Sequence, residues 1–308
     1  MPSIRVGAAL FAALLTVTLA GCATRPHTAS AAGSSTAVIS VVAAENFWGS
    51  LAAQLGGTRV KVTSIINNPD ADPHDYEATP ADGRAIAGAG LVLVNGVGYD
   101  PWAGKLVDAN PAGGRTVLDV GELVGVKAGG NPHRWYSPPD VRKVVDQLTA
   151  DFKRIDPPDA GYFDSQHDTV LNRDLKGYFD AIDGIRAKYA GTPVGASESI
   201  FALLAPALGL NLLTPESFLN AITEGTDPTA GDKTTIDAQI KNRQLKAYVY
   251  NSQNATPDVQ AQVTAAKAAG IPVATITETL TPAGATFQAW QVAQLDALKQ
   301  ALAQGTGK

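Results

Sequence analysis

Short apolar runs alternate with longer stretches of helical spacing along most of the chain. Runs rich in β-branched and apolar residues occupy 38–42, 60–66, 91–95, 117–120, 193–196, 246–250 and 272–277. Runs of this length are typical of buried strands, and the stretches 47–55 and 80–87 between them have the character of helices. Strands that alternate with helices form βαβ units with parallel sheets. The pattern therefore predicts an α/β protein with two separate parallel sheets.

The segment between the two groups of strands has a different pattern. From Tyr162 to Lys176 it contains no glycine or proline, and apolar residues recur at steps of three and four at Leu171, Leu175, Tyr178, Ile182, Ile185 and Tyr189. That spacing places these side chains on one face of a helix. We therefore expect two Rossmann-like lobes with parallel sheets, over 38–150 and 191–308, joined by a long backbone helix within 151–190.

The first 22 residues have the layout of an export signal. Arg5 precedes an apolar run from Val6 to Leu19, which is shorter than the roughly 20 residues needed to span a bilayer. The run ends in Leu-Ala-Gly before Cys22, the only cysteine of the chain, which resembles the lipobox of bacterial lipoproteins. That resemblance implies a signal peptide over 1–22, lipidation of Cys22, a flexible tether over 23–37 and a protein held at the outer face of the bacterial cell membrane. An ordinary secretory signal with a coincidental cysteine is the alternative.

Composition narrows the classes of partner. Hydrophobic residues make up 45% and charged residues 17%, so most of the chain can bury a substantial core. The net charge is −5, and no cluster of lysine and arginine marks a predicted face. Because nucleic acids bind to basic surfaces, we expect no nucleic-acid partner, and we expect the chain to act as a monomer.

Two of the four histidines are candidates for chemistry. His27 lies in the tether and His167 on the helix between the lobes, whereas His74 and His133 each follow a proline in a loop beyond a predicted strand. Proline stiffens such a loop, and loops beyond the carboxyl ends of parallel strands are where α/β proteins bind ligands. One loop histidine is a weak indication, but two in matched contexts favour a shared site.

The sequences around these histidines form two motifs. The first reads Asp-Pro-His-Asp-Tyr-Glu at 72–77 followed by Thr-Pro-Ala-Asp at 79–82, and the second reads Asn-Pro-His-Arg-Trp at 131–135. In this order they resemble the metal-binding substrate-binding lipoproteins of ABC transporters for zinc and manganese, the cluster A-I family that includes adhesin-type lipoproteins. The resemblance extends from about Val38 to Leu302.

The resemblance implies four metal ligands, two from each lobe. The two motifs give His74 and His133, the sequence Gly-Ala-Ser-Glu-Ser-Ile-Phe at 195–201 gives Glu198, and Glu278 stands where the family commonly has aspartate. A second departure is Ser137, where the family commonly has an aspartate that could support the second histidine. A nearby carboxylate in place of Glu278, a helix-capping role for Glu198 and a surface position for Glu278 are the alternatives.

Two neutral imidazoles and two carboxylates would hold a divalent cation with no open position for a reacting water. The resemblance therefore implies an extracytoplasmic solute-binding protein that captures Zn²⁺ or Mn²⁺, with Fe²⁺ as a further candidate, and delivers it to an ABC transporter permease. The absence of a third histidine ligand and of a His-rich loop favours manganese or iron, although the order of binding strengths puts Zn²⁺ above Mn²⁺.

Two other classes of function are alternatives. A metal-dependent hydrolase is one, but the chain has no Gly-x-Ser-x-Gly or His-Glu-x-x-His motif. Glu224 and Asp227 are more simply interpreted as polar residues of a turn than as a catalytic acid pair. A surface adhesin is the other. We therefore expect a carrier that is not an enzyme.

Overall fold

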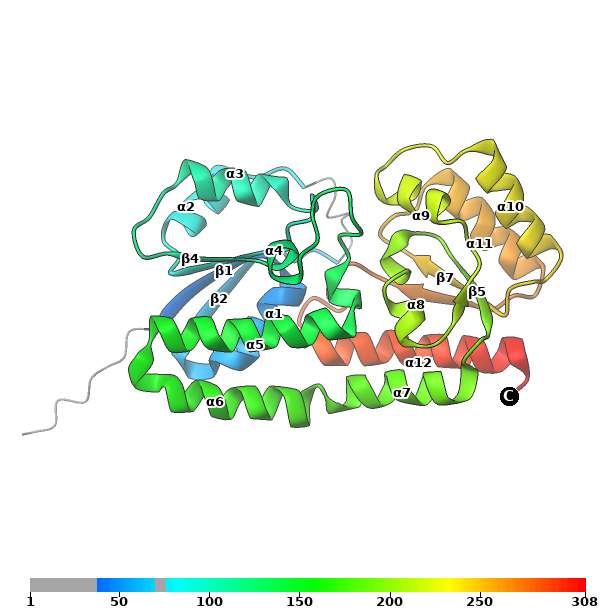
Figure 1. Cartoon of the computed structure of the whole chain (residues 1–308). Coiled ribbons are helices and arrows are strands. Elements are labelled where there is room, and N and C mark those ends of the chain that lie inside the picture. The colour runs from blue at the N-terminus through cyan, green and yellow to red at the C-terminus, as the bar shows by residue number, and fades with distance from the viewer. Residues whose placement is uncertain (1–37, 70–75) are drawn as a thin grey trace, which may run out of the picture. The chain divides into compact units, whose positions relative to one another are not determined.

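Two parallel sheets organise the part of the chain that the computed structural model describes, residues 38–69 and 76–308 (Figure 1). The strands are β1 (Ile39–Glu45), β2 (Val60–Ile66), β3 (Leu91–Val94), β4 (Thr116–Asp119), β5 (Pro193–Ala196), β6 (Asn211–Leu212), β7 (Ala247–Asn251) and β8 (Val273–Ile276). The helices are α1 (Asn46–Gly56), α2 (Pro80–Ala87), α3 (Pro101–Ala109), α4 (Val120–Val124), α5 (Pro138–Ile155), α6 (Ala160–Thr169), α7 (Lys176–Tyr189), α8 (Leu204–Ala207), α9 (Glu216–Thr223), α10 (Ala230–Lys241), α11 (Pro257–Ala268) and α12 (Phe287–Thr306).

The two sheets have the same topology. The first runs β2-β1-β3-β4 and the second β6-β5-β7-β8, and every strand pair is parallel. In each sheet the second strand along the chain lies on one side of the first strand and the later strands lie on the other side. This change of side creates a crevice at the carboxyl ends of the strands. The predicted α/β class with two parallel sheets is confirmed. The boundaries at residues 150 and 190 stay a prediction.

Most predicted strands are present within a residue or two of their expected ends. β1 continues to Glu45, beyond the apolar run that ends at Val42, because parallel pairing with β2 extends to the Glu45–Ile66 pair. β6 has only two residues and was not predicted, since so short a strand leaves no pattern. Pairing with neighbouring strands therefore decides where these strands begin and end, because the preference of their side chains for strand structure is weak there.

The predicted helix between the sheets is confirmed. α6 and α7 follow one another in line, joined through a π-helical turn over Val170–Asp174 (Figure 1). Of the six apolar residues expected on one face, all but Leu171 are buried: Leu175, Tyr178, Ile182, Ile185 and Tyr189. His167 lies on α6, where its Nε2 atom is 2.7 Å from Asp146.

The last helix, α12, packs against elements of both sheets. It contacts α7 and β8, and it also reaches α1, where the Phe287 amide donates a hydrogen bond to Ser50 Oγ at 2.9 Å. One cluster of buried apolar side chains includes Phe47 from α1, Tyr178 from α7 and Leu298 from α12. Both sheets therefore share a core. Among the helices of residues 38–69 and 76–308, none is long and apolar enough to cross a membrane.

Candidate metal centre

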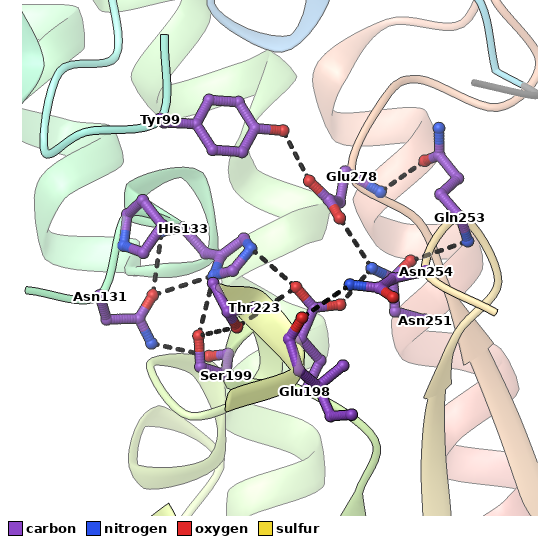
Figure 2. Close-up of polar contacts among 12 residues, drawn as sticks. Tyr99, Asn131, His133, Glu198, Ser199, Thr223, Asn251, Gln253, Asn254 and Glu278 are labelled. Carbon is purple, nitrogen blue, oxygen red and sulfur yellow. Dashed lines mark hydrogen bonds and ion pairs between the residues drawn. The ribbon is translucent and has the colours of Figure 1, made fainter. Parts of the chain in front are cut away.

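Three of the four expected ligands lie together in the structure. His133, Glu198 and Glu278 each offer a ligand atom, and these atoms all lie within 4.8 Å of one another (Figure 2). All three side chains are fully buried. His74 and Cys22 lie outside the described residues.

The three side chains come from segments that follow the carboxyl ends of strands. Glu198 follows β5, Glu278 follows β8, and His133 lies in the loop beyond β4 and α4. Glu198 stands at the N-terminal boundary of a short 3₁₀ turn, but its side chain makes no capping hydrogen bond there. With both glutamates fully buried, a capping role for Glu198 and a surface position for Glu278 are wrong.

The His133 ring is oriented by Asn131. Asn131 Oδ1 accepts hydrogen bonds from the His133 amide and from His133 Nδ1, both at 3.0 Å, while Asn131 Nδ2 donates to the Ser199 carbonyl at 2.7 Å. An amide oxygen can only accept, so Nδ1 donates in this contact, and in the neutral imidazole Nε2 is then the nitrogen whose lone pair can bind a cation. That Nε2 atom lies 3.4 Å from Glu198 Oε1, a spacing at which a cation between the two atoms would bind both.

The support expected from position 137 comes from elsewhere. Ser137 directly precedes α5, and its side chain makes no capping hydrogen bond there. Asn131, inside the second motif, takes the supporting role, and Ser199 Oγ lies 3.3 Å from the same ring nitrogen. His133 therefore has a supporting hydrogen-bond partner although position 137 carries serine in place of aspartate.

The two carboxylates are held by neutral donors. Asn251 Nδ2 donates to Glu198 Oε2 at 2.5 Å and to Glu278 Oε1 at 2.8 Å, and the Tyr99 hydroxyl donates to Glu278 Oε2 at 2.6 Å (Figure 2). Asn251 ends β7 and Tyr99 follows β3. The sequence pattern did not identify either residue. For Asn251 the available signal was a polar side chain directly after the apolar run 246–250, whereas Tyr99 lies beyond a glycine-containing loop and had no such signal.

The chain matches one protein family over most of its length. The family model described as "ZnuA: Zinc-uptake complex component A periplasmic" matches residues 41–301. The chain belongs to this family. The resemblance inferred from the two histidine motifs is thereby confirmed.

Relatives of the family differ in how much of their length is matched. Manganese-binding lipoprotein MntA of Bacillus subtilis (strain 168) is 25% identical over 284 residues, which cover 86% of this chain and 85% of MntA. MntA of Halalkalibacterium halodurans is 26% identical over 138 residues, and the match spans 45% of that protein. The structure of the Mn-bound periplasmic metal binding protein from candidatus Liberibacter asiaticus aligns with a TM-score of 0.70 at 16% identity, covering 86% of this chain and 99% of that one. This last likeness establishes the fold.

A cavity of about 970 Å³ adjoins the cluster. Its lining includes Tyr99, Asn131 and Thr223, each of which hydrogen-bonds to one of the three ligand candidates. Glu224 also lines it, while Glu224 and Asp227 are both exposed and form no buried acid pair. The three ligand candidates themselves are not among the residues that line this cavity.

A buried carboxyl pair lies at the carboxyl end of the first sheet. Asp100 accepts hydrogen bonds from the amides of Asn95 at 2.7 Å and Gly96 at 2.8 Å, which shapes the loop before Tyr99. Burial raises the pKa of Asp100 to about 6 even though these amides lower it. Burial, and then the negative charge of Asp100, raise the pKa of Glu45 well above its usual value. These shifts favour the protonated form of Glu45 over the carboxylate.

Proposed function

We propose that this chain is the extracytoplasmic solute-binding component of an ABC transporter, which captures one divalent transition-metal ion and delivers it to the permease. The supporting observation is the buried cluster of His133, Glu198 and Glu278, in which an imidazole nitrogen and two carboxylates converge within 4.8 Å. Buried carboxylates this close repel one another unless a cation or donors compensate them. His74 is proposed as the fourth ligand.

The proposed cargo is Zn²⁺ or Mn²⁺, with Fe²⁺ as a further candidate. Imidazole suits zinc and iron, whereas carboxylate suits manganese, so the donor set alone admits all three. The relatives named for manganese support Mn²⁺, and the description of the family as a zinc-uptake component supports Zn²⁺. Competitive titration of the metal-free full chain with Mn²⁺, Fe²⁺ and Zn²⁺ identifies the preferred ion.

We further propose that a lipid on Cys22 anchors the protein to the outer face of the cell membrane. The lipobox-like sequence before Cys22 and the lipoprotein naming of MntA support this. In bacterial cells, Cys22→Ser is expected to move the protein out of the membrane fraction. A variant that stays in the membrane fraction to the same extent as wild type would contradict lipidation.

The carrier role is proposed in preference to a metal-dependent hydrolase or an adhesin. A carrier holds metal stoichiometrically without turnover, whereas a hydrolase keeps an open coordination position for water. Metal analysis of the purified chain together with hydrolytic assays distinguishes the two. Turnover that depends on the bound metal would support the enzyme.

The central test is the removal of the two histidines. His133→Ala or His74→Ala is expected to reduce bound metal from one ion per chain to a small fraction, because the imidazole is a principal ligand. The measurement is metal content after equilibration with limiting Zn²⁺ or Mn²⁺. His167→Ala is the matched control, since that ring lies on α6 beside Asp146. Unchanged one-to-one occupancy in His133→Ala would overturn the site.

A further inference from the structure

A buried ion pair braces the loop that carries His133. Arg134 directly follows His133, and Nη2 of its guanidinium pairs with Asp140 Oδ2. The Arg134 and Asp140 side chains are only 12% and 7% exposed, so salt screens their attraction less than it screens a surface pair. Asp140 lies in the first turn of α5, whose buried apolar side chains belong to the shared core. The ion pair therefore ties the histidine loop to a helix that is itself held by packing.

The same guanidinium reaches back to the residue that orients the imidazole. Arg134 Nη1 donates a long hydrogen bond to the Asn131 carbonyl at 3.4 Å, while Nη2 engages Asp140. The Asn131 side chain in turn accepts from His133 Nδ1 at 3.0 Å (Figure 2). A planar guanidinium presents several N–H groups in a fixed fork, so it can hold two partners at once. Contacts therefore run from α5 through the ion pair and Asn131 to the imidazole.

The aromatic anchor of this loop acts on the other side of His133. Trp135 is fully buried, and its ring stacks on Phe47 with the two centroids 3.9 Å apart. This contact fixes the backbone that follows His133. The guanidinium instead holds the backbone of Asn131, two residues before it. The ion pair therefore supplies a constraint that the packing of Trp135 does not.

We propose that Arg134 and Asp140 are a positioning pair that keeps the His133 imidazole directed at the candidate metal site. This inference rests on the proposed metal-binding function. His133 Nε2 lies 3.4 Å from Glu198 Oε1, and a turn of the ring would change that spacing. An imidazole whose outer support can shift is a weaker ligand, because part of the binding free energy is spent on orienting it. Loss of the pair therefore lowers metal affinity without removing a ligand.

Replacement of Arg134 by lysine separates positioning from stability. Arg134→Lys keeps a positive charge beside Asp140, so the full-length chain should unfold in urea near the wild-type midpoint. An ammonium group has one nitrogen and cannot reproduce the fork, so the Asn131 carbonyl loses its donor. We expect Zn²⁺ and Mn²⁺ to bind about tenfold more weakly, the lower end of the range for outer partners of a metal ligand. Competition with a chromophoric chelator measures both affinities.

The matched control is Arg59→Lys. Arg59 also forms an ion pair, with its Nε atom 2.7 Å from Asp159 Oδ2. It directly precedes β2 and so lies at the amino end of that strand, whereas the candidate site lies beyond the carboxyl ends. Arg59→Lys should therefore bind Zn²⁺ and Mn²⁺ as wild type does.

A double variant makes the test independent of the cost of an unpaired charge. Arg134→Met and Asp140→Leu each leave one buried charge without its partner, so each should lower the urea midpoint. The double variant replaces the pair with apolar side chains, an exchange that is often neutral or stabilising for buried pairs. Its midpoint should return toward wild type, while its affinity for Zn²⁺ and Mn²⁺ should stay about tenfold lower.

Two results would overturn the inference. The first is wild-type affinity for Zn²⁺ and Mn²⁺ in Arg134→Lys. The second is an affinity that falls only as the urea midpoint falls and recovers in the double variant, which would give the pair a structural role alone. Failure of the wild-type chain to bind either ion would contradict the proposed function itself, so the two kinds of failure are distinguishable.

Discussion

A buried imidazole and two buried carboxylates are costly groups to hold within 4.8 Å of one another. The side chains around them lower that cost with directed hydrogen bonds. Asn131 orients the imidazole, while Asn251 and Tyr99 donate to the carboxylates. These donors are neutral, so they stabilise the carboxylates without cancelling the negative charge that would attract a cation.

Removing the partner of His133 should weaken metal binding. Asn131→Ala deletes the acceptor for Nδ1–H, so the ring loses its preferred tautomer and orientation, and we expect affinity to fall by about 10-fold to 100-fold. Competition with a chromophoric chelator measures this loss. Asn110→Ala is the control, because Asn110 caps α3 through the Leu106 carbonyl, apart from the site. Equal affinities in the two variants would contradict the positioning role of Asn131.

The buried pair of Glu45 and Asp100 predicts a pH dependence of stability. Burial raises the pKa of Asp100 from 3.8 to about 6, so the folded chain binds more protons than the unfolded chain between these values, and stability falls as the pH rises through that window. The rise corresponds to about 3 kcal/mol at neutral pH. The pKa of Glu45 is raised by burial and by Asp100, which adds a penalty of the same sign.

Glu45→Gln should therefore stabilise the chain at neutral pH and flatten its pH dependence, since a neutral amide needs no proton. Urea unfolding at a series of pH values from about 4 to 8 checks this. Glu122→Gln, on the exposed side of α4, is the control and should change little. A loss of stability at neutral pH in the Glu45→Gln variant would contradict the account.

At the scale of elements, α12 was absent from the sequence prediction although it is the longest helix of the described residues. Its buried face mixes apolar residues such as Leu295 and Leu298 with the buried amides Gln291 and Gln294. The polar members blur the apolar period that identifies a helix. Gln294 Oε1 accepts hydrogen bonds from the Thr277 amide at 2.7 Å and the Tyr136 hydroxyl at 3.0 Å. Only the folded chain reveals these contacts.

The packing of α12 predicts a large loss of stability when one of its buried side chains is shortened. Leu298 is 1% exposed within the shared core, so Leu298→Ala should cost about 2–5 kcal/mol of unfolding free energy. Urea denaturation measures the loss. Val117 is 46% exposed, and Val117→Ala should cost well under about 1 kcal/mol. Similar costs for both variants would argue against α12 as part of the core.

At the scale of the whole molecule, the candidate site draws on loops from both sheets. Tyr99 and His133 follow strands of the first sheet, whereas Glu198, Asn251 and Glu278 end or follow strands of the second. Hydrogen bonds join the two groups, from Tyr99 to Glu278 and from Asn131 to the Ser199 carbonyl. An ion held here therefore links the two sheets and should stabilise the entire fold.

Metal removal should lower the melting temperature accordingly. A ligand at about 100 times its Kd stabilises the folded state by about 2.7 kcal/mol, which for a chain of this size shifts Tm by about 4–5 °C. Thermal melts of the chelator-treated chain with and without Zn²⁺ or Mn²⁺ measure the shift. Mg²⁺ is the control, because it prefers oxygen ligands and retains its waters. An equal shift with Mg²⁺ would contradict a site built around imidazole.

The sequence by itself determined the α/β class, the two parallel sheets and the long helix, because alternation of apolar runs and the spacing of residues such as Leu175 and Ile182 are local properties. The histidine motifs likewise identified the family. Only the tertiary structure decided that Glu198 and Glu278 are buried beside His133, and that Asn251 and Tyr99 hold them. These contacts join residues up to 179 positions apart, and parallel strands bring such residues to one edge with no signal in their spacing along the chain.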